Sequence, residues 1–216
     1  MNPILTQLGH LGVIPVVVLD NAAHAIPLGE ALHVGGLPCA EITFRTDAAA
    51  ESIRAMSTAL PDMLVGAGTV LTVAQAETAV AAGAKFIVTP GFDPTVVDWC
   101  LAHDIPITPG VMTPTEINMA LNKGLNVLKF FPAEAAGGVK TLKAIAAPYG
   151  GVKFIPTGGI TPANLPEYLR LPSVHACGGS WLVEKRWIVM GEFETIRELA
   201  EEAVRAVAQA RQKPFS

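Results

Sequence analysis

Lys129 is the residue of this chain with the clearest potential for covalent chemistry. It stands near the end of an apolar segment, VLKFFP at residues 127–132. Apolar surroundings penalise the charged ammonium group and favour the neutral amine, which can attack a carbonyl carbon. A lysine at a strand end more often buries only its stem and holds its charge in water. The segment alone therefore favours a lysine that keeps its charge in water. Other residues of the chain have to decide whether Lys129 is reactive.

A second set of polar residues lies in the segment AEITFR at residues 40–45. Side chains alternate across a strand, so Glu41, Thr43 and Arg45 share one face and apolar residues share the other. The apolar face is expected to pack on helices, which directs the polar face into the centre of a barrel. A buried glutamate is costly without a partner or a function, and Lys129 is the expected partner.

These residues are carried by a regular alternation of short apolar strands and helices. Strands are predicted at residues 13–19, 39–44, 63–67, 86–89, 105–108, 126–130, 153–157 and 174–177. Helices are predicted at residues 3–10, 22–34, 47–60, 73–82, 94–103, 114–123, 138–147, 162–170 and 192–211. Strands separated by helices pair in parallel with both faces covered. Eight such units predict one (β/α)8 TIM-barrel domain across residues 1–216, with a short N-terminal helix. An open doubly wound sheet is the alternative.

The barrel prediction separates Lys129 from the other lysines. Active sites of this fold lie at the C-terminal ends of the strands. Lys129 is the only lysine late in a predicted strand, whereas Lys85 and Lys153 stand at strand starts, and Lys123, Lys140 and Lys143 stand on helices or at their ends. Phe131 and Val127 share the strand face of Lys129. Lys129, Glu41, Arg45 and the strand-end Thr157 are therefore expected to converge in the lumen.

Two Gly-Gly pairs follow the last two predicted strands, in TGGI at residues 157–160 and in CGGSW at residues 177–181. Glycine lets backbone N–H groups approach an anion, and the loops after strands seven and eight form the usual phosphate site of this barrel. The pairs favour phosphate binding over plain turns, and Ser180 adds a possible donor. The segment VGAGTV at residues 65–70 is interpreted as another close-approach loop, without the spacing of a dinucleotide fingerprint.

Composition excludes several functional classes. The 216 residues carry a net charge of −4 and no basic run, which argues against nucleic acid or an acidic membrane surface as partner. The apolar runs are too short to cross a bilayer, and the N-terminus lacks a secretory signature. Three widely spaced cysteines suggest buried thiols in a reducing compartment. The five histidines stand away from strand C-termini, so no metal or cofactor is expected, and a cytoplasmic location is predicted.

Seven segments of the chain resemble one known family. They are EITFR (41–45), VGAGTV (65–70), TPG (89–91), PG (109–110), KFFPAE (129–134), PTGGI (156–160) and GGSWL (178–182). In order and spacing they resemble the 2-keto-3-deoxy-6-phosphogluconate aldolases, or KHG/KDPG aldolases, from about residue 11 to 208. These are class I, Schiff-base enzymes of the Entner–Doudoroff pathway. Glu184 departs from the family pattern, where a proline is common, and residues 184–190 form a less familiar loop.

The resemblance implies roles at the reacting end of the substrate. Lys129 matches the lysine that forms the Schiff base with a 2-keto carbon. Glu41 matches the general acid/base, which moves protons through a water. Arg45 and Thr69 match residues around the pyruvate carboxylate, and Phe131 matches the side chain that packs near the Schiff base.

At the other end, the residues that match the phosphate site are Thr157, Gly158, Gly159, Gly179 and Ser180. The resemblance further implies a homotrimer without a metal. It implies cleavage of 2-dehydro-3-deoxy-6-phosphogluconate to pyruvate and glyceraldehyde 3-phosphate, with activity on 4-hydroxy-2-oxoglutarate beside it. The galactonate epimer of the substrate is an alternative. A metal-assisted sugar-phosphate epimerase and a non-catalytic phosphosugar-binding barrel are less favoured, because strand-end His and Asp ligands are missing and the second would not need Lys129 beside Glu41.

Overall fold

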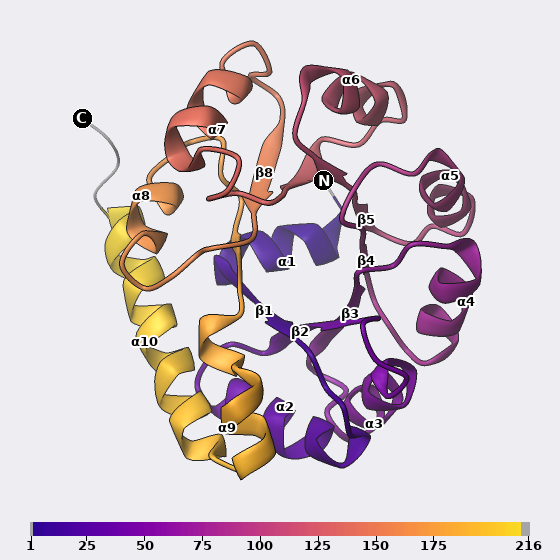
Figure 1. The fold of residues 1–216 in the computed structure, drawn as a ribbon, viewed down its shortest axis with the longest axis vertical. Coiled ribbons are helices and arrows are strands. Elements are labelled where there is room, and N and C mark those ends of the chain that lie inside the picture. The colour runs from indigo at the N-terminus through magenta and orange to yellow at the C-terminus, as the bar shows by residue number, and fades with distance from the viewer. Residues whose placement is uncertain (1, 213–216) are drawn as a thin grey trace.

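The computed structural model describes residues 2–212, which form a closed (β/α)8 barrel (Figure 1). The strands are β1 (Val13–Val17), β2 (Cys39–Thr43), β3 (Leu64–Gly68), β4 (Ile87–Val88), β5 (Ile107–Thr108), β6 (Gly110–Val111), β7 (Val127–Phe130), β8 (Lys153–Pro156) and β9 (Cys177–Gly179). All paired strands run parallel, as strands joined by helical crossovers must. The predicted barrel is therefore confirmed.

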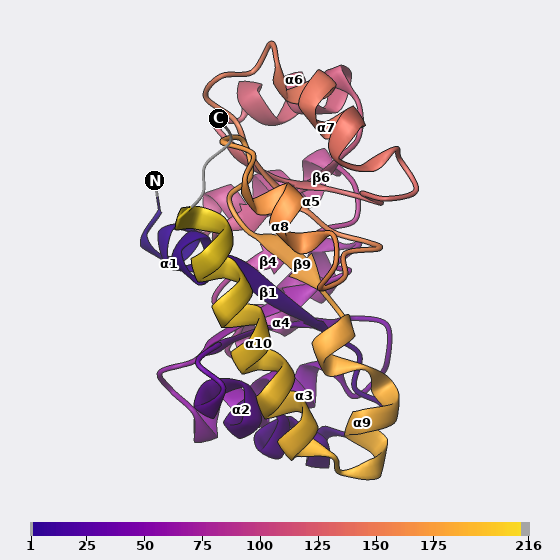
Figure 2. The same cartoon turned by 90° about the vertical axis from the view of Figure 1, so that its left-hand side faces the viewer.

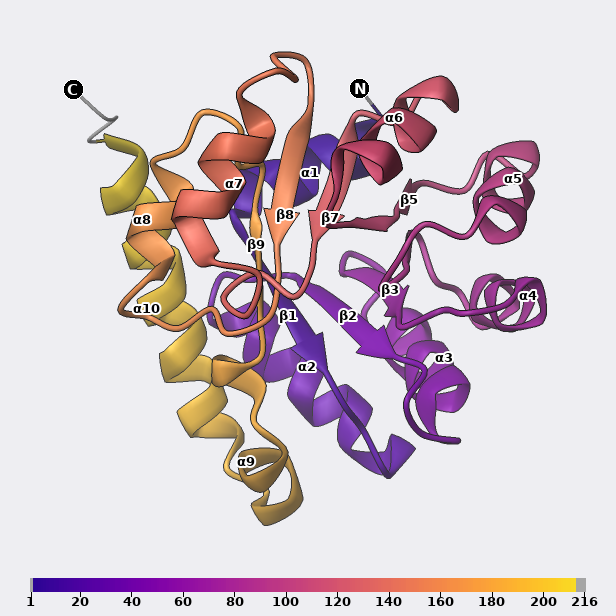
Figure 3. The ribbon, with the colours of Figure 1, turned by 45° about the horizontal axis from the view of Figure 1, so that its top comes forward.

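Helices surround the strands in chain order (Figures 1 and 3). They are α1 (Pro3–Leu11), η1 (Ala22–His24), α2 (Ala25–Val34), α3 (Ala49–Ala59), α4 (Val73–Ala81), α5 (Pro94–Ala102), α6 (Pro114–Asn122), α7 (Gly138–Ala146), α8 (Leu165–Leu169), η2 (Trp181–Val183), α9 (Lys185–Met190) and α10 (Phe193–Gln212). Several begin where a side chain caps them. Asp93 accepts from the first amides of α5, and Thr113 forms a reciprocal capping box with Glu116 at α6.

The sheet closes into a ring through its first and last strands. Six strands hydrogen-bond in the order β5-β4-β3-β2-β1-β9, and three in the order β6-β7-β8. Two single bridges, Phe154 to Val174 and Thr157 to Gly178, join β8 to the segment that carries β9. The fifth strand is split into β5 and β6 at Pro109, which has no backbone N–H for a ladder.

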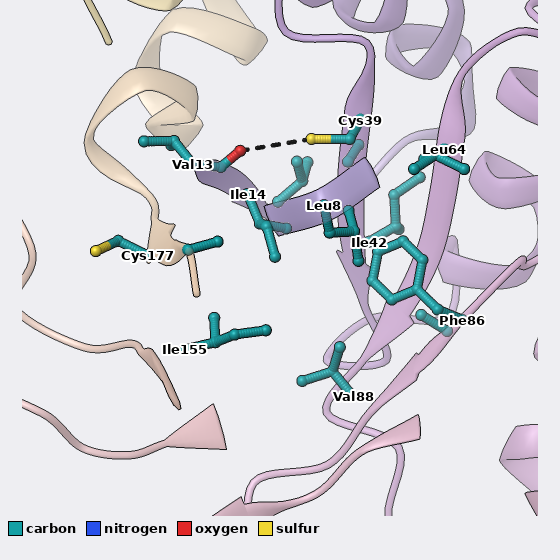
Figure 4. Close-up of a cluster of buried hydrophobic side chains, with 14 of the residues drawn as sticks. Leu8, Val13, Ile14, Cys39, Ile42, Leu64, Phe86, Val88, Ile155 and Cys177 are labelled. Atoms are coloured by element: carbon teal, nitrogen blue, oxygen red, sulfur yellow. Dashed lines mark hydrogen bonds between the residues drawn. The ribbon is translucent and has the colours of Figure 1, made fainter. Parts of the chain in front are cut away.

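The N-terminal end of the barrel is closed by α1. This helix lies across the strands in the view of Figure 1, and Figure 2 shows it on the side of the molecule opposite α9. Its Leu8 is buried among lumen and core side chains that include Ile14, Ile42 and Phe86 (Figure 4). Cys39 is buried beside them, with its thiol directed at the carbonyl of Val13 at 3.6 Å. The lower lumen is thus a packed core, which leaves the C-terminal end for a site.

Two predicted elements differ from the observed ones. The last strand is predicted at residues 174–177, but β9 spans Cys177–Gly179, so its two glycines are strand residues and not a loop. Residues 184–190 are predicted as a loop, but Lys185–Met190 forms α9, which ends at Gly191 in a left-handed conformation. Within residues 2–212, no helix is both long enough and apolar enough to cross a membrane.

Candidate active site

The buried ion pair in the barrel lumen joins Lys129 of β7 to Glu41 of β2. Lys129 Nζ lies 3.5 Å from Glu41 Oε1, and the two side chains are only 5% and 3% exposed. Strand alternation brings them inward, as the sequence predicts. Each is flanked in the sheet by a small or apolar neighbour: Glu41 lies opposite Gly66, and Lys129 lies between Gly110 and Ile155. The lumen therefore encloses an amine and a carboxylate side by side.

Glu41 Oε1 is buried and accepts no hydrogen bond from any part of the chain that the structure describes. The ammonium of Lys129, 3.5 Å away, therefore compensates for the burial of this oxygen by its charge and not by a hydrogen bond. Its neighbour Gly68 explains how it fits, because a Cβ on Gly68 would stand 2.1 Å from the same oxygen. The free oxygen faces the lysine and is ready to accept a proton or a hydrogen bond.

An open cavity lies next to this pair at the C-terminal end of the strands. Its volume is about 320 Å³, and its lining residues are Val16, Val18, Arg45, Phe131, Thr157, Gly158, Gly159, Ile160, Gly178 and Ser180. Phe131 connects it to the lumen, because its ring centre is 5.2 Å from Lys129 Nζ. One side chain, Phe131, thus contacts both the cavity and the neighbourhood of the amine.

Arg45 extends from the end of β2 into the cavity wall and holds Thr69. Its Nε donates to Thr69 Oγ1 at 3.3 Å. Thr69 follows β3 with a φ of 55°, a left-handed conformation that a β-branched residue rarely adopts. Such strain persists only where the surroundings impose it, and it often marks a functional site. The guanidinium still has free donors for a planar anion such as a carboxylate.

The turn at Gly158 and Gly159 forms another part of the cavity wall. Both glycines have positive φ angles, 97° and 79°. Their carbonyls each accept a hydrogen bond: Glu134 N–H donates to Gly158 O and Asn164 Nδ2 donates to Gly159 O, both at 3.0 Å. The N–H groups of Gly159 and Ile160 have no acceptor within residues 2–212. The turn thus leaves two backbone amides without an intramolecular acceptor in residues 2–212.

The second glycine pair differs from the prediction. Gly178 lines the cavity, whereas Gly179 lies under the ring of Trp181, where an added Cβ would be 1.9 Å from Trp181 Cζ3. Gly178 also makes room for Thr157, whose Oγ1 would be 2.3 Å from an added Cβ. These glycines are spacers within a strand, and Gly178, not Gly179, faces the cavity. Ser180 lies on the cavity wall as predicted.

Sequence reasoning missed the contribution of β1 and of α9. Val16 and Val18 line the cavity, and their position at the C-terminal end of a barrel strand was a sufficient signal. An adjoining hollow of about 450 Å³ continues from Arg45 and Ser180 to Lys185 and Arg186. The segment that carries these two cations has no clear helix signal in the sequence. Lys185 pairs with Asp20 at 2.5 Å, so α9 is tied to the end of β1.

The glycines near residue 66, the three cysteines and the possible metal ligands remain to be placed in the structure. Gly66 and Gly68 belong to β3 and are not a loop, because they accommodate Phe86 and Glu41 inside the barrel. Cys39, Cys100 and Cys177 are buried free thiols. Within residues 2–212, no three His, Cys, Asp or Glu side chains are grouped in a way that could hold a metal ion.

Comparison with known proteins identifies the family. The family described as KDPG and KHG aldolase matches residues 4–199. The chain is 50% identical over 207 residues to the 2-dehydro-3-deoxy-phosphogluconate aldolase of Treponema pallidum, covering 96% of this chain and 99% of that protein. The chain belongs to the KDPG and KHG aldolase family. The resemblance found in the sequence is thereby confirmed.

Solved structures of KDPG aldolases share this fold. The enzyme of Legionella pneumophila, with pyruvate captured at low pH as a covalent carbinolamine intermediate, superposes with a TM-score of 0.90 at 41% identity, covering 94% of this chain and 98% of that one. The enzyme of Zymomonas mobilis with 3-phosphoglycerate gives a TM-score of 0.87 at 39% identity, covering 93% and 94%. The aldolase barrel therefore extends over nearly the whole chain.

Proposed function

We propose that this KDPG/KHG-family chain is a class I aldolase that cleaves 2-dehydro-3-deoxy-6-phosphogluconate to pyruvate and glyceraldehyde 3-phosphate. One observation carries the proposal: a lysine and a glutamate are buried together at 3.5 Å, beside a cavity at the C-terminal end of the barrel. An amine that forms an imine needs a proton shuttle at hand, and this pair supplies both groups. The relatives named above have this activity or bind pyruvate covalently.

The reaction begins with attack of Lys129 Nζ on the C2 carbonyl of the substrate. The carbinolamine loses water to give a protonated imine, which withdraws electrons from the C3–C4 bond. Glu41 accepts the proton of the C4 hydroxyl as this bond breaks, and the aldehyde leaves. The remaining enamine is protonated at C3 and hydrolysed, which releases pyruvate and restores the amine. The unpartnered Oε1 of Glu41 has the free lone pairs that these transfers require.

The two ends of the substrate are proposed to bind different parts of the wall. Arg45, supported by Thr69, is suited to the carboxylate next to the keto group, because a guanidinium binds a carboxylate through parallel hydrogen bonds. Phe131 covers the imine. The phosphate is assigned to the turn of Gly158 and Gly159, since its free amides suit an anion. Binding of the remote phosphate orients the reacting carbon against the amine.

The remaining wall residues of the phosphate end are Thr157, Gly179 and Ser180. Thr157 and Ser180 line the cavity directly, and the Zymomonas mobilis relative holds 3-phosphoglycerate, a three-carbon phosphate. Gly179 does not line the cavity, so we assign it a structural part beneath Trp181. The phosphate end favours a phosphorylated substrate over 4-hydroxy-2-oxoglutarate, which we propose as a slower substrate. The galactonate epimer stays an alternative.

We also propose how the protein assembles and where in the cell it acts. A homotrimer is supported by the family resemblance and by the large apolar side chains exposed around α4 to α6, which are Leu71, Leu101, Met112, Met119 and Leu121. A cytoplasmic location is supported by the free thiols. A single domain across residues 1–216 is supported by the family match over residues 4–199. Residue 1 and residues 213–216 of that domain lie outside the described part.

Trapping with borohydride tests the function. The protein is incubated with pyruvate and sodium borohydride, and the modified peptide is mapped by mass spectrometry. We expect a reduced pyruvyl adduct on Lys129 and none in Lys129→Arg. Lys153→Arg is the matched control, because Lys153 lies at the other end of a strand, with its ammonium on the carbonyl of Pro172 at 2.6 Å. An adduct elsewhere, or no adduct, would sink the Schiff-base mechanism.

A further inference from the structure

Tyr168 of α8 is the largest of the fully buried side chains in the described chain. A buried phenol hydroxyl needs a hydrogen-bond partner, and any nearby carbonyl could provide one. The hydroxyl instead donates to Oε1 of Glu134, a residue of the segment between β7 and α7. A hydrogen bond to a carboxylate is roughly twice as strong as one between neutral groups. The pair therefore links α8 firmly to the segment that follows the lysine strand.

Glu134 in turn supports the glycine turn in two ways. Its backbone N–H donates to Gly158 O at 3.0 Å. Its side chain lies directly beside Gly159, because a Cβ built on Gly159 would be 2.6 Å from Glu134 Cβ and 2.7 Å from Glu134 Cγ. The turn rests on Glu134, so the position of Glu134 determines where the amides of the turn point.

The same pair is packed against the start of α7. A Cβ on Gly138, the first residue of α7, would be 3.0 Å from Glu134 Oε1 and 3.4 Å from the Tyr168 hydroxyl. The helices α7 and α8 lie next to each other in Figures 1 and 3. Asn164 holds the turn from the other side, through Gly159 O. The glycine turn is thus clamped between α8 and the segment of Glu134.

We propose that Tyr168 and Glu134 form a positioning pair, which holds the Gly158–Gly159 turn in place and thereby sets the preference for a substrate with a terminal phosphate. This inference rests on the proposed function, because it assumes that the phosphate binds at this turn. Neither residue touches the reacting atoms. Tyr168 acts through Glu134, and Glu134 acts through the backbone of the turn.

Two further features agree with this role. Burial raises the pKa of Tyr168, and its hydrogen bond to Glu134 raises that pKa further, so the hydroxyl stays a donor at neutral pH. The hydrogen bond also holds the carboxylate of Glu134 against the buried hydroxyl of Tyr168. A carboxylate released beside the turn would be free to move towards the substrate phosphate and repel it. Loss of the hydroxyl therefore disturbs both the geometry and the charge of the phosphate end.

The test is Tyr168→Phe, which removes the hydroxyl and retains the ring. We expect KM for the phosphorylated substrate to rise about tenfold, the effect of one lost charge-assisted hydrogen bond. The kcat/KM for 4-hydroxy-2-oxoglutarate and the exchange of deuterium into pyruvate should change by less than about twofold, because the exchange needs Lys129 and Glu41 but no phosphate contact. Glu134→Gln retains an acceptor oxygen and should stay near the wild-type KM, whereas Glu134→Ala should match Tyr168→Phe.

Tyr149→Phe is the matched control, because the Tyr149 hydroxyl binds Asn118 Oδ1 at 3.1 Å and lies outside the cavity wall. It should leave every constant unchanged. Equal losses on both substrates, or a lower melting temperature with an unchanged KM, would overturn the positioning role. If the wild-type protein exchanged no deuterium into pyruvate, the Lys129 chemistry itself would be wrong. The two failures are therefore distinguishable.

Discussion

The pair of Lys129 and Glu41 has the geometry of a reactive site more than of a stabilising salt bridge. A strong charge-assisted hydrogen bond measures about 2.7–2.9 Å, whereas this contact is 3.5 Å. Removing two charged groups from water is costly, and only excellent geometry compensates for it. The extra distance and the unpartnered oxygen leave room for chemistry between the two groups. The pair thus lowers the stability of the fold locally, because it holds two reactive charged side chains together in the lumen.

Replacing Glu41 by Gln tests its role as a proton carrier. The amide has nearly the same shape but cannot take up a proton at neutral pH, so we expect kcat to fall about 10²–10⁴-fold. The trapped adduct on Lys129 should still form, only more slowly. Steady-state kinetics and the borohydride assay measure both quantities. Glu51→Gln is the control, since Glu51 is exposed and, within residues 2–212, pairs only with Arg54 of the same helix. A wild-type kcat in Glu41→Gln would contradict the assignment.

At the scale of single elements, small residues in the strands create the space for the site. Gly66 leaves room for the ring of Phe86, Gly68 for the carboxylate of Glu41, and Gly178 for Thr157. A Cβ added to any of these three glycines would lie within 2.4 Å of the side chain that it faces. Glycine weakens a strand, so its presence inside one often marks such a close approach. The barrel therefore has room for polar side chains in its lumen, because glycines in the neighbouring strands carry no side chain there.

Gly68→Ala should disturb the site without replacing a reacting group. The methyl group would overlap Glu41 Oε1 and force the carboxylate away from Lys129. A displacement of about 1 Å in an active site can lower activity about 10²-fold, and we expect a loss of kcat of that order. Gly150→Ala is the control, because no atom of the part of the chain that the structure describes lies within 4 Å of its added Cβ. Unchanged kinetics in Gly68→Ala, with the variant folded by circular dichroism, would show that Glu41 tolerates displacement.

The elements also show which features the sequence could predict. Alternation along β2 and β7 was enough to place Glu41 and Lys129 in the lumen, because a strand leaves only two directions for a side chain. The sequence predicts loops at the glycines of β3 and β9, since glycine is common both in turns and at close approaches, and only the neighbouring side chains distinguish the two. The helix α9 was missed because no side chain caps its start and its residues give no clear period.

At the scale of the whole molecule, the two ends of the described chain stabilise each other at the N-terminal end of the barrel. Arg211, near the end of α10, donates to the carbonyls of Gly9 at 2.6 Å and His10 at 2.9 Å, in the last turn of α1. It also donates to the carbonyl of His175 at 3.1 Å. The imidazole of His175 meets the carbonyl of Leu5 in α1 at 2.7 Å. One arginine thus fastens the helix that closes the barrel, far from the catalytic end.

Arg211→Met should therefore lower stability and leave the chemistry intact. The last carbonyls of a helix need partners, and a hydrogen bond from a charged group contributes about 1.5–3 kcal/mol where it is well shielded. Because Arg211 is partly exposed, we expect the free energy of unfolding to fall by about 1–2 kcal/mol, with a lower melting temperature by calorimetry. Arg205→Met on the same helix should change stability by less than about 0.5 kcal/mol, since among the described residues Arg205 makes only an exposed contact of 3.6 Å with Glu201. The yield of the pyruvyl adduct on Lys129 at 25 °C should match the wild type in both variants. An equal effect of the two substitutions on stability would show that α1 is held by apolar packing alone, and a loss of adduct in Arg211→Met would show that the two ends of the barrel are coupled.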